Sequence, residues 1–287
     1  MSDTQAIREM VFRRYKAYVR HATKHDLLER YIAQWLDEKR ATPKVLDVLD
    51  IGAGTGRLGA ALLKAAKQRS VTVNLVAVEP CQSTALELRK TLSNYAVAGN
   101  TVSVRENVFE ELESGFRGQF DLVLASHVSY YFADLASFVS DAIRATKDGG
   151  EVLFIGTSTT IMQNDVYQTL YRQLRRNTLL PRTLESDGFF TFGENLELEL
   201  IDQNARFAKS SMSSTITFEL DEIAATVRAL EEGAPGPVLE AMAFLWRYPD
   251  AAMLTIREEW LDLLMRLLAA HTPLVLAYDD IALMASR

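Results

Sequence analysis

Three glycines, Gly52, Gly54 and Gly56, stand within five residues of one another, directly after an apolar segment over 45–51. That segment predicts a buried strand, and the pattern of residues 57–64 predicts a helix. Glycine is needed where the backbone takes a positive φ or where a ligand must lie against it. A glycine loop between a strand and the first turn of a helix also presents bare backbone N–H groups to a ligand. The sequence therefore predicts a ligand-binding loop here.

Two carboxylates narrow the class of ligand. Asp50 precedes the loop, and Glu79 follows a second strand-like segment over 71–78. A dinucleotide fingerprint, G-x-G-x-x-G, requires a third glycine where this chain has Arg57. A negative charge at Asp50 suits a cationic ligand and repels a pyrophosphate, whereas Glu79 at a strand tip can accept hydrogen bonds from ribose hydroxyls. These features disfavour an NAD(P) reductase.

An acid, a G-x-G-x-G loop and an acid closing the second strand together resemble the class I S-adenosylmethionine-dependent methyltransferases. The resemblance implies S-adenosylmethionine as cofactor and a doubly wound α/β fold, which is a Rossmann-like, mostly parallel seven-stranded sheet with an antiparallel last strand and a helical cap. It also implies that one group of residues holds the cofactor. By position, Asp50 with Gly52, Gly54 and Gly56 would hold the amino-acid end of the cofactor, and Glu79 with Pro80 would hold the ribose. Asn107 with Val108 would contact the adenine, and Ser126 would lie near the methionine portion.

The composition is that of a globular enzyme. The chain has 287 residues, 48% of them hydrophobic, and a net charge of −7, which argues against gripping nucleic acid through its phosphates. The beginning of the chain lacks a signal-peptide pattern, and no apolar run approaches the ~20 residues of a membrane helix. The single cysteine, Cys81, has no metal-ligand spacing around it. We expect a cytoplasmic protein without metal, nucleic-acid or membrane partners, and the sequence leaves its oligomeric state open.

Strands and helices alternate through the middle of the chain, which is typical of a parallel sheet covered on both faces. Lys147-Asp-Gly-Gly150 predicts a helix stop. The expected strands cover 45–51, 71–78, 101–105, 119–126 and 151–156, and the expected helices cover 56–69, 81–95, a short turn near 109–114, and 133–147.

The pattern changes after Gly156. Helices are expected over 161–177, 221–232, 237–247 and 255–270, with a strand over 206–219. Residues 194–202 fit a helix or a strand, and Thr255 with Glu258 predicts a capping box. A final strand over 274–285 is expected to run antiparallel at the sheet edge. We expect a single domain over 1–287, made of an N-terminal helical lid (1–40), a cofactor-binding core (41–156), a substrate-binding cap (157–272) and a closing edge strand (273–287).

His127 lies just beyond the strand that ends at Ser126, and Tyr130 and Tyr131 follow it. In an open parallel sheet, ligands bind beyond the carboxyl ends of the strands, so this segment should border the glycine loop. His127 is therefore the candidate catalytic residue, since an imidazole can take a proton from an acceptor. One of the two tyrosines is expected to pack in the core.

The chain also resembles a narrower family, histamine N-methyltransferase and its bacterial relatives. The likeness rests on the aromatic and basic stretch over 12–25, on Val78-Glu-Pro80, on Tyr130-Tyr131 and on the closing strand around Tyr278-Asp-Asp280. The resemblance implies a substrate site made of Tyr15, Lys24, His127, Tyr130, Tyr131, Phe190 and Asp279.

Three of those positions depart from the family. Its substrate-holding glutamate, glutamine and asparagine become Lys24, His127 and Asp279 here. A base thus replaces an acid that would attract a cationic amine, so histamine is not the expected acceptor. We expect methyl transfer to a small molecule, at nitrogen by kinship. An O-methyltransferase of a small aromatic or carboxylic metabolite, a protein methyltransferase and a non-catalytic S-adenosylmethionine-binding regulator stay open as alternatives.

Overall fold

The computed structural model describes residues 14–16, 18–38, 44–95, 99–177, 193–246 and 250–286. These residues form two compact units. The sheet unit contains 24–158, 193–212 and 280–286, and the helical unit contains 14–23, 159–177 and 213–279. Each unit thus joins segments that are distant in the sequence.

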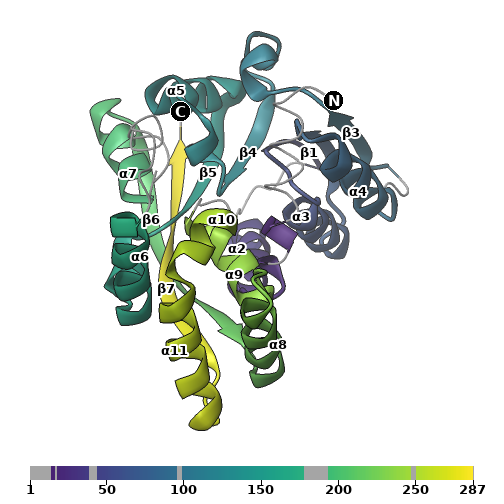
Figure 1. Cartoon of the computed structure of the whole chain (residues 1–287). Helices are drawn as coiled ribbons and strands as arrows, with labels where there is room; N and C mark the ends of the chain where they lie inside the picture. The colour runs from purple at the N-terminus through teal and green to yellow at the C-terminus, as the bar shows by residue number, and fades with distance from the viewer. Residues whose placement is uncertain are drawn as a thin grey trace. The chain divides into compact units, whose positions relative to one another are not determined.

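The sheet has seven strands in the order β3-β2-β1-β4-β5-β7-β6. Neighbouring pairs among the first five strands are parallel, and β7 runs antiparallel to β5, which confirms the predicted fold class (Figure 1). The strands are β1 (Val45–Ile51), β2 (Thr72–Val78), β3 (Thr101–Arg105), β4 (Phe120–Ser126), β5 (Thr146–Thr157), β6 (Arg206–Phe218) and β7 (Leu274–Ser286). The expected position of the final strand is wrong in one respect, because β6 and not β7 lies at the edge.

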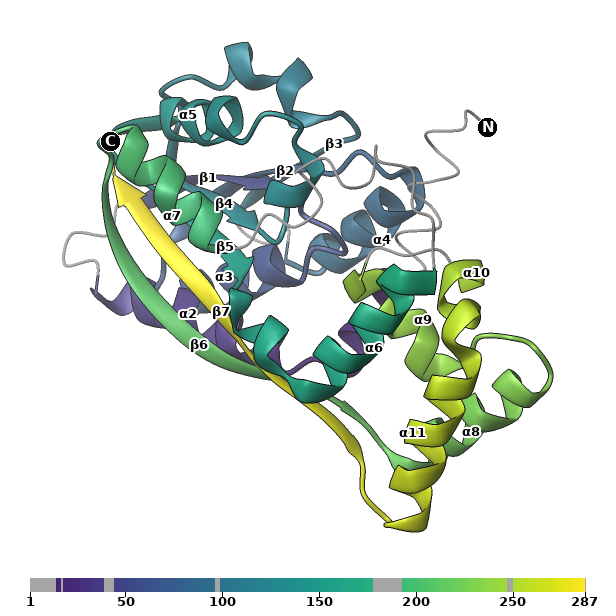
Figure 2. The same cartoon turned by 60° about the vertical axis from the view of Figure 1, so that its left-hand side comes forward.

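Helices cover both faces of this sheet because its strands send alternate side chains to two apolar clusters. Leu122 and Leu124 of β4 pack with α2, α3 and α4, whereas Val123 and Ala125 of the same strand pack with α5 and α7. Figure 2 shows α3 and α5 on opposite sides of the sheet. The helices are α2 (Lys24–Glu38), α3 (Arg57–Gln68), α4 (Gln82–Ser93), α5 (Leu135–Ala145) and α7 (Gly193–Asp202), with short turns η1 (Phe109–Glu111), η2 (Glu113–Gly115) and η3 (Ser129–Tyr131). Residues 194–202, which were ambiguous in sequence, are therefore helical.

The predicted helix stop at Lys147–Gly150 is wrong. Helix α5 ends at Ala145, and β5 already begins at Thr146. The register between β4 and β5 shifts in this stretch, so Phe120 faces Thr146 while Leu122 faces Glu151. The glycines therefore serve an irregularity inside the strand, where a Cβ at Gly150 would lie 2.8 Å from the Phe120 carbonyl oxygen.

An ionic cluster fixes this amino-terminal end of the sheet. Lys147 Nζ lies 2.6 Å from Asp47 Oδ2 and 2.9 Å from Asp121 Oδ2. Desolvation lowers the pKa of Lys147, but the hydrogen bonds to the two carboxylates outweigh it and raise that pKa overall. The cluster lies at the opposite end of β1 and β4 from the glycine loop, so its role is structural.

The helical unit has a core of its own, in which Trp260 is completely buried. A Cβ at Gly236 would lie 2.4 Å from the Cα of Thr226, so glycine allows α8 and α9 to approach closely. The predicted capping box of Thr255 and Glu258 is wrong, because α11 begins at Arg257 with Ile256 as its N-cap residue, and the Thr255 hydroxyl donates to the Ala252 carbonyl. The unit contains α6 (Asp165–Asn177), α8 (Leu220–Glu231), α9 (Pro237–Trp246), α10 (Asp250–Met253), α11 (Arg257–Ala269), η4 (Thr159–Gln163) and η6 (Leu254–Ile256).

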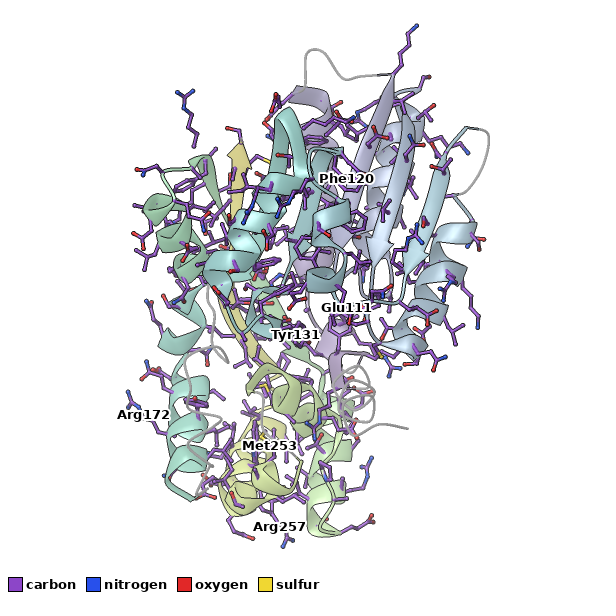
Figure 3. The ribbon with its side chains drawn as sticks, turned by 90° about the horizontal axis from the view of Figure 1, so that it is seen from above. Glu111, Phe120, Tyr131, Arg172, Met253 and Arg257 are labelled. Atoms are coloured by element: carbon purple, nitrogen blue, oxygen red, sulfur yellow. The ribbon has the colours of Figure 1, made fainter. Side chains whose placement is uncertain are left out.

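Surface features in the described residues are those of a globular protein. No described helix is long and apolar enough to cross a membrane. Arg172 is exposed and points away from α6 (Figure 3). Among the described residues, His, Cys, Asp and Glu side chains form no group of three or more that could hold a metal ion.

Candidate functional site

The register of the sheet brings the predicted cofactor residues to one edge of the sheet unit. Ile51 of β1 is paired with Val78 of β2 and with Ala125 of β4, and Val78 is paired with Arg105 of β3. The segments that follow these parallel strands therefore lie beside one another, and we call this the carboxyl edge. The carboxyl edge carries the glycine loop 52–56, Glu79 with Pro80, Asn107 with Val108, and Ser126 with His127.

Glycine is required at the three positions of the loop for different physical reasons. All three have positive φ, between 55° and 81°. A Cβ at Gly52 would lie 2.3 Å from Val128 Cγ1, and one at Gly56 would lie 2.5 Å from Leu88 Cδ1, so both positions need glycine for protein packing. At Gly54 nothing lies within 4 Å of such a Cβ. Gly54 is thus the position where the loop is open to a ligand.

The loop is tied to the end of β2. Glu79 Oε2 accepts a hydrogen bond from the Gly54 N–H at 3.0 Å, and Glu79 Oε1 accepts one from the Cys81 N–H at 2.9 Å. The Ala53 N–H also donates to the Val78 carbonyl at 3.0 Å. The Glu79 carboxylate is thus held at the open part of the loop, where a ribose is expected, and it also shapes that loop.

Asp50 is almost completely buried, with 3% of its surface exposed, and its Oδ2 has no hydrogen-bond partner. That oxygen lies toward helix α3, because a Cβ at Gly59 would be 3.4 Å from it. Burial, and secondarily the negative charge of Glu79, raise the pKa of Asp50 to about 7. A buried carboxylate without a partner fits a cationic group of a ligand, although its orientation toward α3 was not expected from the sequence.

Residues beyond β3 form the next part of the carboxyl edge. The Asn107 side-chain amide donates to Glu111 Oε2 at 3.1 Å, and Val108 caps the short turn η1 that contains Glu111. Both Asn107 and Val108 are half-buried. Their assignment to an adenine stays a prediction.

The β4 tip carries the candidate catalytic residue. His127 has a left-handed backbone with φ 55°, and its N–H donates to the Ile155 carbonyl at 2.8 Å. His127 Nε2 lies 3.7 Å from Asp280 Oδ1, and the two side chains are 10% and 1% exposed. Ser126, which precedes His127, is half-buried at the end of β4. The structure therefore places an imidazole beside a buried carboxylate at the carboxyl edge.

The aromatic residues after His127 differ from expectation. Neither Tyr130 nor Tyr131 is buried in the core, and Tyr131 is 56% exposed. Phe132 takes the packing role instead, because its ring stacks on Phe138 at a centroid distance of 3.9 Å. The rings of Tyr130 and Tyr131 contact each other at 4.5 Å, edge to face. Figure 3 labels Tyr131 in the turn after β4. Neither tyrosine ring is thus part of the buried core.

Asp280 is a further candidate site residue, which sequence reasoning missed. The alternation of β7 carries the signal, since Leu276, Tyr278 and Asp280 are buried while Ala277 is exposed and Asp279 is half-buried. A carboxylate on the buried side of a strand requires a polar partner. Asp279, the residue chosen from the family resemblance, has the opposite orientation.

The other predicted substrate residues are spread over both units. Asp279 belongs to the helical unit, where it accepts a hydrogen bond from the Ser213 hydroxyl at 2.8 Å. Tyr15 is a half-buried helical residue of the same unit. Lys24 begins α2 of the sheet unit, but its side chain and the whole of Phe190 lie outside the described residues. The structure therefore brings together, from that set, His127, Tyr130 and Tyr131.

Residues 21–23, at the end of the N-terminal stretch that carried the narrower resemblance, pack against β6 and α8. Ala22 forms an antiparallel bridge with Ile216, so residues 21–23 lie beside the end of β6 in the helical unit. His21 Nε2 lies 3.4 Å from Glu222 Oε1, and the His21 ring packs against Phe218. His21 is thus accounted for by packing.

Comparison with known proteins decides the class of the site. Residues 49–152, which include the glycine loop, Glu79 and the β4 tip, match the family model of a methyltransferase domain. This part of the chain is a methyltransferase domain. The protein is accordingly an S-adenosylmethionine-dependent methyltransferase, and the open Gly54, the carboxylate of Glu79 and the partnerless buried oxygen of Asp50 fit that cofactor. No curated protein sequence matches the chain significantly.

Solved structures support the fold of the methyltransferase. A Bacillus halodurans protein assigned as a methyltransferase is 16% identical, with 88% of this chain and 97% of that chain covered and a TM-score of 0.50. The YcgJ protein of Bacillus subtilis is 14% identical, with 90% and 99% covered and a TM-score of 0.53. A Galdieria sulphuraria protein assigned as a sarcosine dimethylglycine methyltransferase is 13% identical, with 90% and 84% covered and a TM-score of 0.51. At these identities the likeness concerns the fold alone. A particular kinship to histamine N-methyltransferase is not shown by these comparisons.

Proposed function

We propose that this methyltransferase acts on a small molecule, at a nitrogen atom, and that histamine is not its acceptor. The observation that carries the proposal is the carboxyl edge itself. The open Gly54 and the carboxylate of Glu79 follow β1 and β2, while His127 and the pair Tyr130–Tyr131 follow the adjacent strand β4. Aromatic walls with a few convergent polar groups are typical of a small-molecule site.

Different residues of the carboxyl edge would contact different parts of the cofactor. Glu79 would accept the ribose hydroxyls, and Asn107 with Val108 would contact the adenine. Gly54 would let the amino-acid end lie against the backbone, near the carboxylate of Asp50. Pro80 would fix the chain after Glu79, and Ser126 would contribute near the methionine portion. When bound, S-adenosylmethionine supplies an activated methyl group, so the protein mainly has to orient the acceptor and exclude water.

His127 would supply the group that accepts the proton of the methyl acceptor. A primary or secondary amine loses a proton in the course of methylation, and an imidazole is suited to receive it near neutral pH. Nitrogen is preferred here because of the residues that resemble small-molecule N-methyltransferases.

One observation favours a second candidate, O-methylation of a small phenol or hydroxyl compound. Neutral amines need no base before they attack, whereas a phenol does, and His127 beside the buried Asp280 has the composition of such a base.

A screen of acceptors with radiolabelled S-adenosylmethionine tests both candidates. We expect labelled product from at least one small amine, azole or phenol, with S-adenosylhomocysteine formed in equal amount. Transfer of label only to protein substrates would contradict the proposal. Binding of S-adenosylhomocysteine by calorimetry, without turnover of any acceptor class, would instead support a cofactor-binding regulator.

A further inference from the structure

We propose that Asp280 is the positioning residue for His127, and that the two side chains form a proton-accepting pair in the methyltransferase. The inference deepens the proposed function and rests on it, because it defines the acceptor as a molecule that gives up a proton on methylation. The pair joins the turn after β4 to strand β7, within the sheet unit.

The register explains why the two residues meet. Ser126 is paired with Ile155 on β5, and Thr157, two residues further on, is paired with Asp280 on β7. His127 follows Ser126 directly, and its Nε2 lies 3.7 Å from Asp280 Oδ1 across the end of β5. Strand β5 thus separates the two parent strands, and its last residues leave room for the side chains to approach each other over it.

The backbone of His127 shows that this position is fixed by its surroundings. A left-handed φ of 55° is uncommon for a non-glycine residue, and backbone strain of this kind is commonly stored at functional sites. The hydrogen bond from the His127 N–H to the Ile155 carbonyl holds the turn in place. With a regular extended backbone at His127, the imidazole ring would point away from its present position beside Asp280.

The burial of Asp280 determines the electrostatics of the pair. With a side chain only 1% exposed, its carboxylate requires a cationic or hydrogen-bonding partner in the protein. At 3.7 Å, Asp280 Oδ1 makes no hydrogen bond to His127 Nε2, so an ionised Asp280 acts through its charge and favours the tautomer that carries the proton on Nε2, with the lone pair on Nδ1. The same carboxylate stabilises the imidazolium that forms when Nδ1 accepts a second proton.

The proton balance limits the class of acceptor. An N–H or O–H bond of the acceptor breaks, its electron pair stays on the nitrogen or oxygen, and the proton goes to His127. Acceptors with such a bond near neutral pH include primary and secondary amines, azoles and phenols, whereas a carboxylic acid is already ionised there. Tertiary amines and thioethers have no proton to release, and a proton-accepting pair gives them no advantage.

Histidine NMR tests the pair without any acceptor. The chain contains four histidines, His21, His25, His127 and His271, so ring ¹⁵N labelling gives few signals, and the His127→Asn variant assigns the signal of His127. Other ionisable groups at this edge include Asp50 and Glu79 of the cofactor site, Glu194, which is hydrogen-bonded to Ser158 at 2.6 Å, and the phenols of Tyr130 and Tyr131. The pH titration is therefore compared between the wild type and Asp280→Asn.

The expected result is an Nε2–H tautomer in the wild type and a titration midpoint that falls by about one pH unit or more in Asp280→Asn. Asp121→Asn, which removes a carboxylate from the opposite end of β4, should leave the His127 signal unchanged. An Nδ1–H tautomer in the wild type, or an equal midpoint in Asp280→Asn, would overturn the pair. The wild-type tautomer decides the matter even if Asp280→Asn does not fold.

Turnover of an acceptor from the screen adds an independent readout. Asp280→Asn should lower kcat at least about tenfold with little change of KM, since the proton is accepted during the chemical step. An equal loss in Asp121→Asn would overturn this reading. Calorimetry with S-adenosylhomocysteine should give unchanged affinity in Asp280→Asn, and a wild type that fails to bind it would count against the proposed function rather than against the pair.

Discussion

Asp50 and Glu79 are two buried carboxylates at the ends of adjacent strands, and they are coupled through charge. Burial and the negative charge of Glu79 together raise the pKa of Asp50 to about 7. The partner that Asp50 Oδ2 lacks in the protein is the kind of group that a cationic cofactor brings. Without a cationic group beside it, the buried Asp50 carboxylate is therefore expected to lower the free energy of unfolding of this methyltransferase, and bound cofactor should restore it.

The first prediction concerns the stability of the protein without cofactor. The folded-state pKa of Asp50 is raised above its unfolded value, so the folded protein holds a proton that the unfolded chain has lost between about pH 4 and pH 7. This contribution to stability is present at low pH and is lost as the pH rises through about 7. Between pH 5 and pH 8 it amounts to about 2–3 kcal/mol. Urea unfolding should show that Asp50→Asn gains this much relative to the wild type over that interval; parallel pH profiles for both proteins would contradict it.

The second prediction concerns the ribose contact. Glu79→Gln should weaken S-adenosylmethionine binding by about 1.5–3 kcal/mol for each charge-assisted hydrogen bond lost. It should also lower the melting temperature without cofactor, because one side of the amide would present N–H groups to the N–H of Gly54 or Cys81. Calorimetry measures the affinity, and Glu38→Gln on the exposed end of α2 is the matched control. Unchanged affinity in Glu79→Gln would remove the ribose assignment.

The sheet unit was predictable because its signals are local. Apolar runs of the right length, separated by helical periodicity, placed β1 to β4 within one residue of their observed bounds, and the glycine loop marked the carboxyl edge. The placement of Asp50, the glycine loop and Glu79 at neighbouring strand ends depends only on the order of the strands. That order follows from the alternation of strands and helices along the chain.

The features that were missed depend on contacts between distant segments. The alternation of β7 places Asp280 on the buried side of the strand, but its proximity to His127 depends on the pairing of Asp280 with Thr157 of β5, which no local pattern predicts. Lys147–Gly150 has the local signature of a helix end, but the register of β5 against Phe120 makes it part of a strand. The edge position of β6 is likewise decided by its pairing with β7.

The third prediction separates the glycines of the loop. Gly52→Ala would place a methyl group 2.3 Å from Val128 Cγ1 at a φ of 66°, so it should destabilise the fold strongly and weaken binding only as a consequence. Gly54→Ala meets no atom within 4 Å, and only its φ of 55° causes strain, about 1–2 kcal/mol. It should lower cofactor affinity with a smaller drop in melting temperature. Thermal denaturation with and without S-adenosylhomocysteine gives both quantities, and the reverse order of effects would show that the ligand does not lie at Gly54.

The last prediction concerns histamine. Lys24 stands where the resembling enzymes have a glutamate, and a positive charge near a protonated amine disfavours it by several kcal/mol. Histamine should therefore be methylated about 100-fold less efficiently, as kcat/KM, than the best acceptor of the screen. Lys24→Glu should raise the relative rate with histamine, whereas Lys64→Glu on the exposed face of α3 should not. Radiolabelled methyl transfer compares the three proteins directly. Efficient turnover of histamine by the wild type would show that Lys24 does not act on the acceptor, while the methyltransferase domain and its cofactor site would stand.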